Sequence, residues 1–473
     1  MSEGTRGVKS VRADSKPHRV RAVAAALFAV ALLISCRAGA APLLAIEHVT
    51  IVDVAHGRTT APRTVLIKDG RIAAIAAGDV HIPRDATRLD GRSKFLIPGL
   101  IDLHVHLFNN ASHRPANEWA FPLFVANGVT GVREMNTTPD ELMQVAHWRE
   151  AVDRGELIAP SVLAAGVFPR GDTDAQARQA VREAAQLHAD FIKVFSEVAP
   201  SRWRAILDEA RTVHMPVDGH VPAAVSLAES AQAGQRTAEH LMQAYEACSS
   251  REREMLDARR GLGADAAVAL RDAQERDILA SFDAAACRRA AKVVAAAGQA
   301  QVLTIVLEYF DPSRPRDDFT ADPRWPLLRA DEQARWRRIL EHEAGNEREL
   351  AELRWSVTCS IVRTFAAAGA TLLAGTDAPM PLVYPGYALH DELEQLVACG
   401  LSNARALRAA TSGAARLLKL PDTGRVQRGA HADLVLLDAD PLRDVRNLRR
   451  IHAVVLAGRL LQRAQLDALL ATP

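Results

Sequence analysis

The sequence has no excess of charge of either sign. Its 473 residues include 58 Lys and Arg against 57 Asp and Glu, which gives a formal net charge of +1. A basic field that would attract nucleic acid and an acidic field that would attract a polycation are therefore both missing. Hydrophobic residues make up 48% of the chain and charged residues 24%, as in an ordinary globular protein of two or three domains.

The sequence also lacks the cysteine and glycine motifs of several common sites. Its five cysteines show no CxxC or other closely spaced pair, which excludes a zinc knuckle. No glycine-rich fingerprint follows an apolar run, so a dinucleotide-binding sheet is not favoured. A small buried thiol is expected at Cys248, Cys287, Cys359 and Cys399, although an oxidising compartment would permit disulfides among them.

Long apolar runs are absent except near the N-terminus. The run AVAAALFAVALLIS, residues 22–35, is shorter than the roughly 20 residues of a typical membrane-spanning helix. Six Lys and Arg precede it and the small residues AGA follow it, which is the pattern of a secretory signal over residues 1–41. Cleavage after Ala40 and lipidation of Cys36, in the lipobox-like LISC, both fit this pattern. Either route predicts an exported protein that is periplasmic, secreted or anchored through a lipid, with no transmembrane span after processing.

The remaining chain divides into strand-like ends and an alternating middle. Residues 42–94 and 419–473 carry short strand patterns, with a hairpin signal at Asp69-Gly70, and are expected to form one small β-sandwich domain. In residues 95–418 eight apolar runs alternate with helical stretches, which predicts an α/β fold, a (β/α)8 TIM-type barrel. A doubly wound open sheet is the structural alternative. Two long polar helical stretches, after His240 and from about Asp311, are expected to be either walls of the active site or solvated helices.

Several of the expected barrel strands end in residues that can bind metal. His104 and His106 alternate along the first run and so point to one side, where two imidazoles could bind one divalent metal. A lysine inside an apolar strand is costly unless it is paired or modified. Each residue alone has a structural explanation, but five strand ends of this kind in one barrel favour a metal centre. Its members are His104, His106, Lys193, His220, His240 and Asp377.

This order of residues resembles the amidohydrolase superfamily, and within it the imidazolonepropionase-like branch with its Xaa-Pro and related metal-dependent dipeptidases. The motifs that carry the resemblance are spread over most of the chain: IPGLIDLHVHL, GVTGVRE, FIKV, AGTDAP, LHDELEQLVACGLSNARALRAATSGAARLLKL and GRVQRGAHADLVLLDADPL. The resemblance implies two divalent metal ions, zinc foremost with manganese, cobalt or iron as alternatives, bridged by an N6-carboxylated Lys193. By the same resemblance His104, His106 and Asp377 hold the first metal, and His220 and His240 hold the second.

The implied reaction is hydrolysis of a C–N amide bond, in a dipeptide or an N-acyl amino acid, by a hydroxide that the two metals share. Asp377 is the catalytic residue that would take the proton and pass it to the leaving amine. Hydrolysis of a cyclic amide, lactone or other ester is one alternative, and a non-catalytic binding protein on the same scaffold is another. Tyr245 is a candidate to support the oxyanion. Arg133 is a candidate to bind a substrate carboxylate, with a structural ion pair as its alternative. A small molecule or dipeptide is the expected partner, and the oligomeric state is left open.

Overall fold

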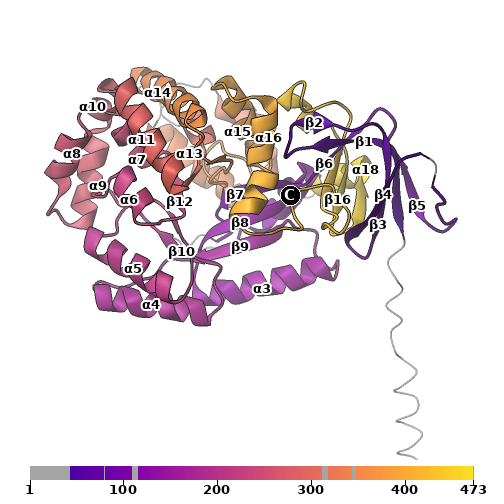
Figure 1. Ribbon diagram of the computed structural model, residues 1–473, viewed down its shortest axis with the longest axis horizontal. Helices are drawn as coiled ribbons and strands as arrows, with labels where there is room; N and C mark the ends of the chain where they lie inside the picture. The colour runs from indigo at the N-terminus through magenta and orange to yellow at the C-terminus, as the bar shows by residue number, and fades with distance from the viewer. Residues whose placement is uncertain (1–42, 79, 109–115, 312–317, 344–347, 472–473) are drawn as a thin grey trace, which may run out of the picture. The chain divides into compact units, whose positions relative to one another are not determined.

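The computed structural model describes residues 43–78, 80–108, 116–311, 318–343 and 348–471 (Figure 1). The expected export signal, including Cys36, lies outside the described residues. Within the described part of the chain, no helix combines the length and the hydropathy that a membrane crossing requires.

Eight parallel strands form the centre of the fold. Five of them pair in the order β11-β10-β9-β8-β7 and three in the order β12-β13-β14. The two sheets join on one side through the Arg236 amide, which donates to the Val217 carbonyl at 2.8 Å, and on the other through the Asp377 amide, which donates to the His104 carbonyl at 2.7 Å. The predicted (β/α)8 barrel is therefore confirmed. Its strands are β7 (Leu100–Val105), β8 (Val129–Thr137), β9 (Ser161–Val167), β10 (Phe191–Val194), β11 (Val217–Gly219), β12 (Thr237–Glu239), β13 (Ala300–Val302) and β14 (Leu372–Leu373).

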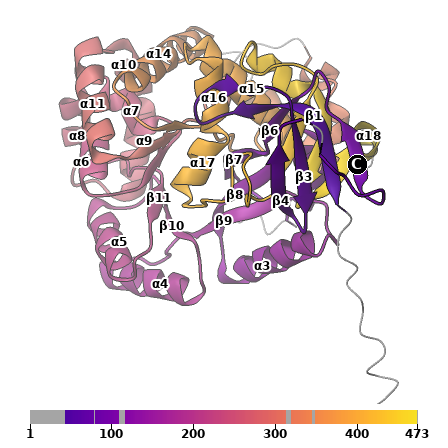
Figure 2. The same cartoon turned by 45° about the vertical axis from the view of Figure 1, so that its right-hand side comes forward.

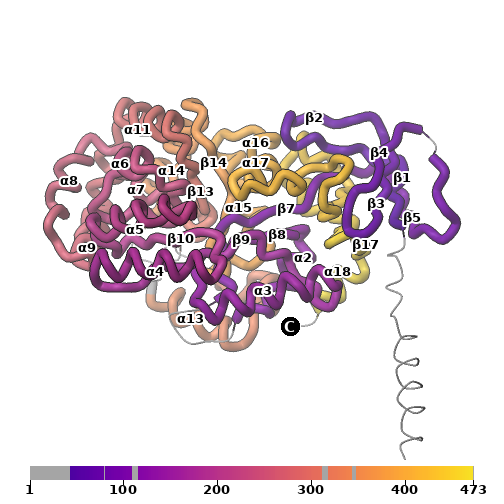
Figure 3. Tube along the Cα trace, turned by 60° about the horizontal axis from the view of Figure 1, so that its bottom comes forward, coloured from indigo at the N-terminus to yellow at the C-terminus, as the bar shows by residue number. Residues whose placement is uncertain are grey.

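Helices follow the strands and cover the barrel, as Figures 1 and 3 show for α3, α4 and α5. Local sequence explains where they begin: Thr138 and Thr173 form capping boxes with Glu141 and Gln176, which satisfies backbone amides that the first turn leaves free. After β7 to β11 come η1 (Glu118–Ala120), α2 (Phe121–Ala126), α3 (Pro139–Asp153), α4 (Asp174–Gln186), α5 (Pro200–Thr212) and α6 (Leu227–Gln232).

The longest connections follow β12 and β13, where the sequence predicts long helical stretches. The β12 connection holds α7 (Met242–Ala247), α8 (Glu252–Arg259), α9 (Ala264–Ala273), α10 (Glu275–Ala280) and α11 (Ala284–Ala297). The β13 connection holds α12 (Val306–Tyr309), η2 (Phe319–Ala321), η3 (Trp325–Leu327), α13 (Ala330–Glu343) and α14 (Arg348–Ala367). After β14 come α15 (Tyr387–Ala398), α16 (Asn403–Ala409) and α17 (Ser412–Leu417).

Strands from both ends of the chain form a separate β-rich domain, with the indigo β1, β3 and β4 near the yellow C-terminal strands in Figures 1 and 2. Its sheet runs β17-β16-β15-β6-β1-β3-β4, and β2 and β5 also pair with β1. β1 pairs with β3 through its first half and with β6 through its second, so it joins two parts that enclose a core with members such as Ile46, Val65 and Leu436. The bounds are β1 (Leu44–Asp53), β2 (Arg58–Thr59), β3 (Arg63–Lys68), β4 (Arg71–Ala76), β5 (Thr87–Asp90), β6 (Phe95–Pro98), β15 (Leu434–Leu437), η4 (Val445–Arg449), β16 (Ile451–Leu456), β17 (Arg459–Gln462) and α18 (Arg463–Leu470).

The hairpin signal at Asp69-Gly70 is confirmed. Strands β3 and β4 pair antiparallel up to Lys68 and Arg71, and the two turn residues have φ angles of 49° and 72°. Both angles are positive, as the tight turn that matches the strand twist requires.

The run Phe95–Val105 differs from expectation because it forms two strands instead of one. Its first half, β6, pairs antiparallel with β15 in the β-rich domain, and its second half, β7, pairs with β8 in the barrel. The change occurs at Gly99, where a Cβ atom would collide with the Thr130 side chain. An apolar periodicity alone does not reveal that one run serves two sheets.

The cysteines also differ from expectation. Cys248 forms a disulfide with Cys287, and Cys359 forms one with Cys399. The expectation of isolated thiols is wrong because helices that lie far apart along the chain pack side by side. The first bridge joins the end of α7 to α11, and the second joins α14 to the end of α15.

We expect both disulfides to form in protein purified without reductant and to stabilise it. Each closes a loop of 39 or 40 residues, and a bridge of this span contributes about 2–4 kcal/mol to the free energy of unfolding. Non-reducing peptide mapping should find the two linked peptide pairs, and urea unfolding with reductant should shift to lower urea. Alkylation of these cysteines in unfolded, unreduced protein would contradict the pairing.

Candidate metal centre

The two histidines of the HxH motif meet Asp377 at one end of the barrel. His104 lies in β7, and His106 follows the last residue of that strand. Their Nε2 atoms lie 3.2 Å and 3.0 Å from the same Asp377 oxygen, Oδ1. The two imidazoles therefore face one side, as the strand alternation predicts.

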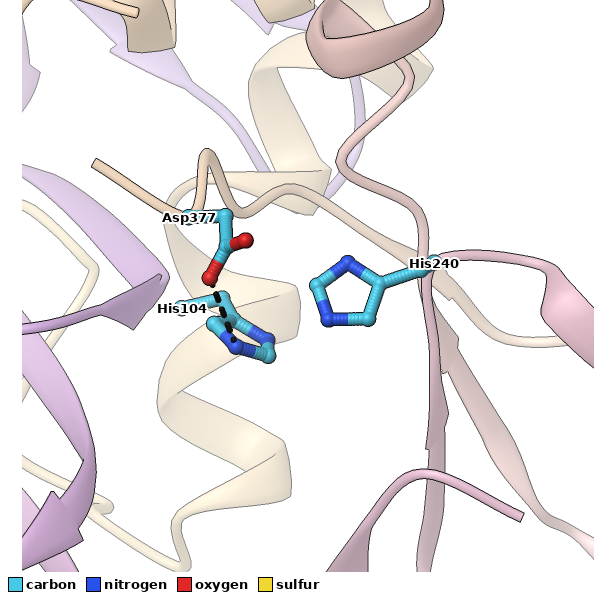
Figure 4. Close-up of side chains that lie close together, drawn as sticks. All are labelled: His104, His240 and Asp377. Carbon is cyan, nitrogen blue, oxygen red and sulfur yellow. Dashed lines mark ion pairs between the residues drawn. The ribbon is translucent and has the colours of Figure 1, made fainter. Parts of the chain in front are cut away.

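His220 and His240 come to the same place from the ends of β11 and β12. The ring of His240 lies 4.5 Å from that of His104 and 4.9 Å from that of His220, measured between centroids. One donor atom each of His104, His240 and Asp377 lie within 4.8 Å of one another (Figure 4). In this view His240 points toward the other two from a separate segment of the chain. The structure thus groups residues that the resemblance divides between two metals.

The backbone at two of these positions adopts an uncommon conformation. His240 and Asp377 have φ angles of 62° and 65°, in the left-handed region that residues other than glycine seldom occupy. Such a conformation costs on the order of 1–3 kcal/mol and is concentrated at functional sites. Both residues stand where a strand ends, so the turn directs their side chains into the barrel mouth.

Lys193 lies in β10 with a fully buried side chain. Its Nζ makes no hydrogen bond with any described residue and lies 4.9 Å from the Phe195 ring centroid. Burial lowers the lysine pKa from 10.5 to about 8. Gly219 permits the close packing here, since a Cβ atom on it would come within 2.8 Å of the Lys193 Cδ. A neutral amine is consequently accessible at this position near physiological pH.

Three residues that sequence reasoning missed orient the histidines. The Nδ1 atoms of His104, His240 and His220 lie 2.9 Å from Glu239 Oε2, 2.8 Å from Thr304 Oγ1 and 3.2 Å from Ser196 Oγ, in that order. A hydrogen bond at one ring nitrogen selects the tautomer and leaves Nε2 for a ligand. The only sequence feature that could have identified them is their position, because Glu239, Thr304 and Ser196 all lie at or just after the end of a barrel strand.

The protonation states of the histidines and of Asp377 favour metal binding. Burial, with the charges of neighbouring cations, lowers the pKa of His240 to about 3 and that of His220 well below its usual value. Burial also opposes the charged form of His106, but Asp377 outweighs it and raises the His106 pKa. Burial would raise the pKa of Asp377, yet His104 and then His106 hold it well below its usual value. At neutral pH His220 and His240 are therefore neutral imidazoles and Asp377 is an anionic carboxylate, which are the forms that bind a metal.

The suggestion that Arg133 binds substrate is wrong. Its side chain is fully buried below the histidines and does not line the pocket. Its guanidinium donates to Asp218 Oδ2 at 2.8 Å, to Glu239 at 3.0 and 3.1 Å, and to the Leu103 carbonyl. The alternative, a structural ion pair, is correct, with Asp218 and Glu239 as partners in place of the adjacent Glu134.

A pocket of about 460 Å³ opens above the cluster. His106, His220, His240 and Asp377 line its floor. Tyr245 forms part of the wall, and its hydroxyl lies 2.7 Å from Thr358 Oγ1. Burial raises the tyrosine pKa well above its usual value, so its proton stays on the oxygen. Other wall residues come from α9, α10, α12 and α14, so parts of both long connections are walls of the pocket.

A comparison with models of protein families shows to which family this chain belongs. The model of the Amidohydrolase family matches residues 95–257 and 333–461, well over half of the chain. The chain belongs to the Amidohydrolase family. This amidohydrolase is accordingly a hydrolase of a family that generally uses metal ions, and it carries a histidine and aspartate group able to hold one.

Solved structures and curated relatives resemble this amidohydrolase to different extents. Bottromycin amidohydrolase is 25% identical with a TM-score of 0.68, covering 90% of this chain and 88% of its own. A protein described as a prolidase from Bifidobacterium longum is 27% identical with a TM-score of 0.60, covering 91% and 99%. Dihydroorotase from Anaeromyxobacter sp. (strain K) is 38% identical over 104 residues, which is 20% of this chain and 22% of the dihydroorotase. The chain therefore matches only about a fifth of that curated relative.

Replacing Arg133 by methionine should destabilise the amidohydrolase and not merely weaken substrate binding. The variant leaves two buried carboxylates, Asp218 and Glu239, without their shared cation, and breaking such a pair costs about 3–5 kcal/mol. Urea unfolding measures the loss, with Arg154→Met as the matched control because Arg154 pairs with exposed carboxylates. If the variant unfolds at the same urea concentration as the parent but has a raised KM, Arg133 binds substrate after all.

Proposed function

We propose that this amidohydrolase holds two divalent metal ions, zinc foremost, and hydrolyses the C–N bond of a dipeptide or an N-acyl amino acid. The observation that carries the proposal is the meeting of His106, His220, His240 and Asp377 at the floor of one pocket, with His104 and Lys193 buried beside them. The proposed ligands are His104, His106, Lys193, His220, His240 and Asp377.

The chemistry of these residues fits a metal. His104 Nε2, Asp377 Oδ1 and Lys193 Nζ are buried, yet none makes a hydrogen bond with a described residue, and a buried polar atom without a partner is costly. A metal would satisfy the first two. Lys193 requires one step more, because an ammonium cannot bind a cation. Its neutral amine can react with carbon dioxide to give a carbamate, whose two oxygens suit a bridge between metals.

When bound, the two ions would supply water activated near neutral pH and would polarise the carbonyl of the substrate. Asp377 accepts the proton of the attacking water and delivers it to the leaving nitrogen, since its carboxylate faces both the histidines and the pocket. Tyr245 keeps its proton and can donate to the oxyanion from the wall. Water attacks directly, so no covalent enzyme intermediate forms.

The substrate class is supported by the size of the pocket and by the neighbouring structures. A volume of about 460 Å³ lies within the usual range for small-molecule sites. Two of the proteins that resemble the chain at 25% identity or more are named as an amidohydrolase of bottromycin and as a prolidase. Amide or peptide bonds are therefore the bonds we assign to this pocket.

We also propose that the protein is exported, either secreted into the periplasm or medium or held at the membrane through a lipid on Cys36. Two disulfides among the described residues support an oxidising compartment. The charged and apolar pattern of residues 1–41 supplies the signal.

Metal analysis of the purified protein should find close to two divalent ions per chain. The Lys193→Ala variant should retain fewer than two and lose about 100-fold or more of its activity, because a bridging ligand is missing. Elemental analysis and chelator titration measure this, and Lys292→Ala, an exposed lysine on α11, is the control. The same single ion in the parent and in the Lys193→Ala variant would show that Lys193 does not bridge metals.

A substrate panel tests the reaction itself. The metal-loaded enzyme should hydrolyse dipeptides or N-acyl amino acids faster than lactones and hydantoin-like rings, and a chelator should abolish turnover. Amine release and ring opening are followed in parallel assays. Turnover of the rings alone would favour the cyclic substrates, and activity in metal-free protein would overturn the metal-dependent mechanism.

A further inference from the structure

The connection after β12 places an arginine beside the metal centre. Arg271 lies in α9, lines the pocket and has a side chain that is only 14% exposed. Its Nη1 lies 3.3 Å from Ser196 Oγ, and that hydroxyl lies 3.2 Å from His220 Nδ1. One hydroxyl group therefore separates the guanidinium from an imidazole of the candidate centre.

The segment that carries Arg271 is held firmly at its base. The disulfide between Cys248 and Cys287 closes it. Next to the bridge, the Asp283 amide donates to the Cys248 carbonyl at 2.7 Å and the Ser250 amide donates to the Ser281 carbonyl at 2.9 Å. A binding residue on a support of this kind loses little conformational freedom when a ligand arrives.

The partners of Arg271 leave its charge weakly compensated. Its Nε and Nη2 donate to one oxygen of Asp272 at 3.2 and 3.0 Å, but the Asp272 side chain is 64% exposed, and an ion pair with so exposed a partner contributes little. Its other hydrogen bonds to residues that the structure describes go to the Ser196 hydroxyl and the Met242 thioether, at 3.3 and 3.9 Å. Both are neutral acceptors near the limit of hydrogen-bond distance.

The other arginine in the pocket wall is differently placed. Arg354 lies 2.6 Å from Glu275 and 3.5 Å from Glu308, and it also contacts Asp311. Three carboxylates surround this guanidinium. Glu246, a further wall residue, feels the charge of Arg271 but forms its direct ion pair with the buried Arg259. Of the pocket's arginines, Arg271 is thus the one whose charge can be given to an incoming anion.

We propose that Arg271 binds a carboxylate of the substrate, carried on the carbon next to the scissile nitrogen. This inference rests on the proposed hydrolysis of an amide at the histidine cluster and names the residue that recognises the carboxylate of its substrate. A guanidinium binds a carboxylate with two parallel, charge-assisted hydrogen bonds, which are stronger than its contacts with the hydroxyl and the thioether. The released amine is then a free amino acid, and an amide that lacks the carboxylate is a poor substrate.

Pairs of substrates that differ only in this group test the inference. Each N-acetyl amino acid or dipeptide of the panel is compared with its C-terminal carboxamide, in the parent, in Arg271→Met and in Arg276→Met. Arg276 is an exposed arginine on the neighbouring helix α10 and does not line the pocket, so it is the matched control. We expect Arg271→Met to lower kcat/KM for the acids about 10- to 150-fold and to leave the carboxamides and the metal content unchanged.

Two results would overturn the assignment of Arg271. One is an equal loss for acids and carboxamides with less bound metal, which would mean that Arg271 only supports Ser196 and His220. The other is an unchanged preference for the acid in Arg271→Met. Calorimetric binding of L-leucine and L-proline against their amides separates this inference from the proposed reaction. If the parent hydrolyses no amide but binds the acids better than the amides in an Arg271-dependent way, the reaction fails and the carboxylate site stands. If that binding preference is also absent, both fail.

Discussion

The buried carboxylate of Glu239 connects the barrel interior to the candidate metal centre. It accepts from Arg133 on one side and lies 2.9 Å from His104 Nδ1 on the other, with the Thr237 hydroxyl as a third partner. Burial alone would raise its pKa, but the charge of Arg133 and then the contact with His104 hold the pKa well below its usual value. A hydrogen bond from Nδ1 to this anion would leave the His104 Nε2, which lies 3.2 Å from Asp377 Oδ1, available to a metal.

The need to compensate the buried charge of Glu239 explains why polar groups accumulate on this side of the barrel. A carboxylate under the histidines needs a cation, which Arg133 supplies, and Arg133 reaches a second carboxylate, Asp218. Asp218 in turn pairs with Arg236. Each charge in this chain is buried or partly buried and has an opposite charge beside it, as the low dielectric of a protein interior requires. His104 is thereby positioned by a network of charged residues that do not line the pocket.

The sequence predicts the barrel and the grouping of the histidines because both follow from patterns that recur along the chain. Alternating apolar runs indicated the eight strands, and an HxH pair, a lysine and an aspartate at strand ends indicated a common site, because parallel strands bring their ends together. The role of Arg133 was predicted wrongly because the sequence pattern is the same for a strand-end arginine that binds a substrate and for one that pairs with a buried carboxylate. Arg271 could not be found at all, because its position depends on how a helical connection folds back over the barrel. The two disulfides were not predicted for the same reason. Their partners are 39 and 40 residues apart in the sequence, and only the packing of the helices brings them together.

Lys193 shows most clearly why this site calls for chemistry beyond the side chains themselves. With a pKa of about 8, Lys193 is mostly ammonium at pH 7, and that charge already contributes to the lowered pKa of His220. An ammonium so close to these imidazoles would repel any metal that they hold, and a neutral amine would leave its nitrogen without a partner. The proposed conversion to a carbamate anion would remove both problems, because an anion attracts the metals and its two oxygens can bind them. The burial of Lys193 therefore supports the proposed carboxylation and is also a consequence of the barrel packing.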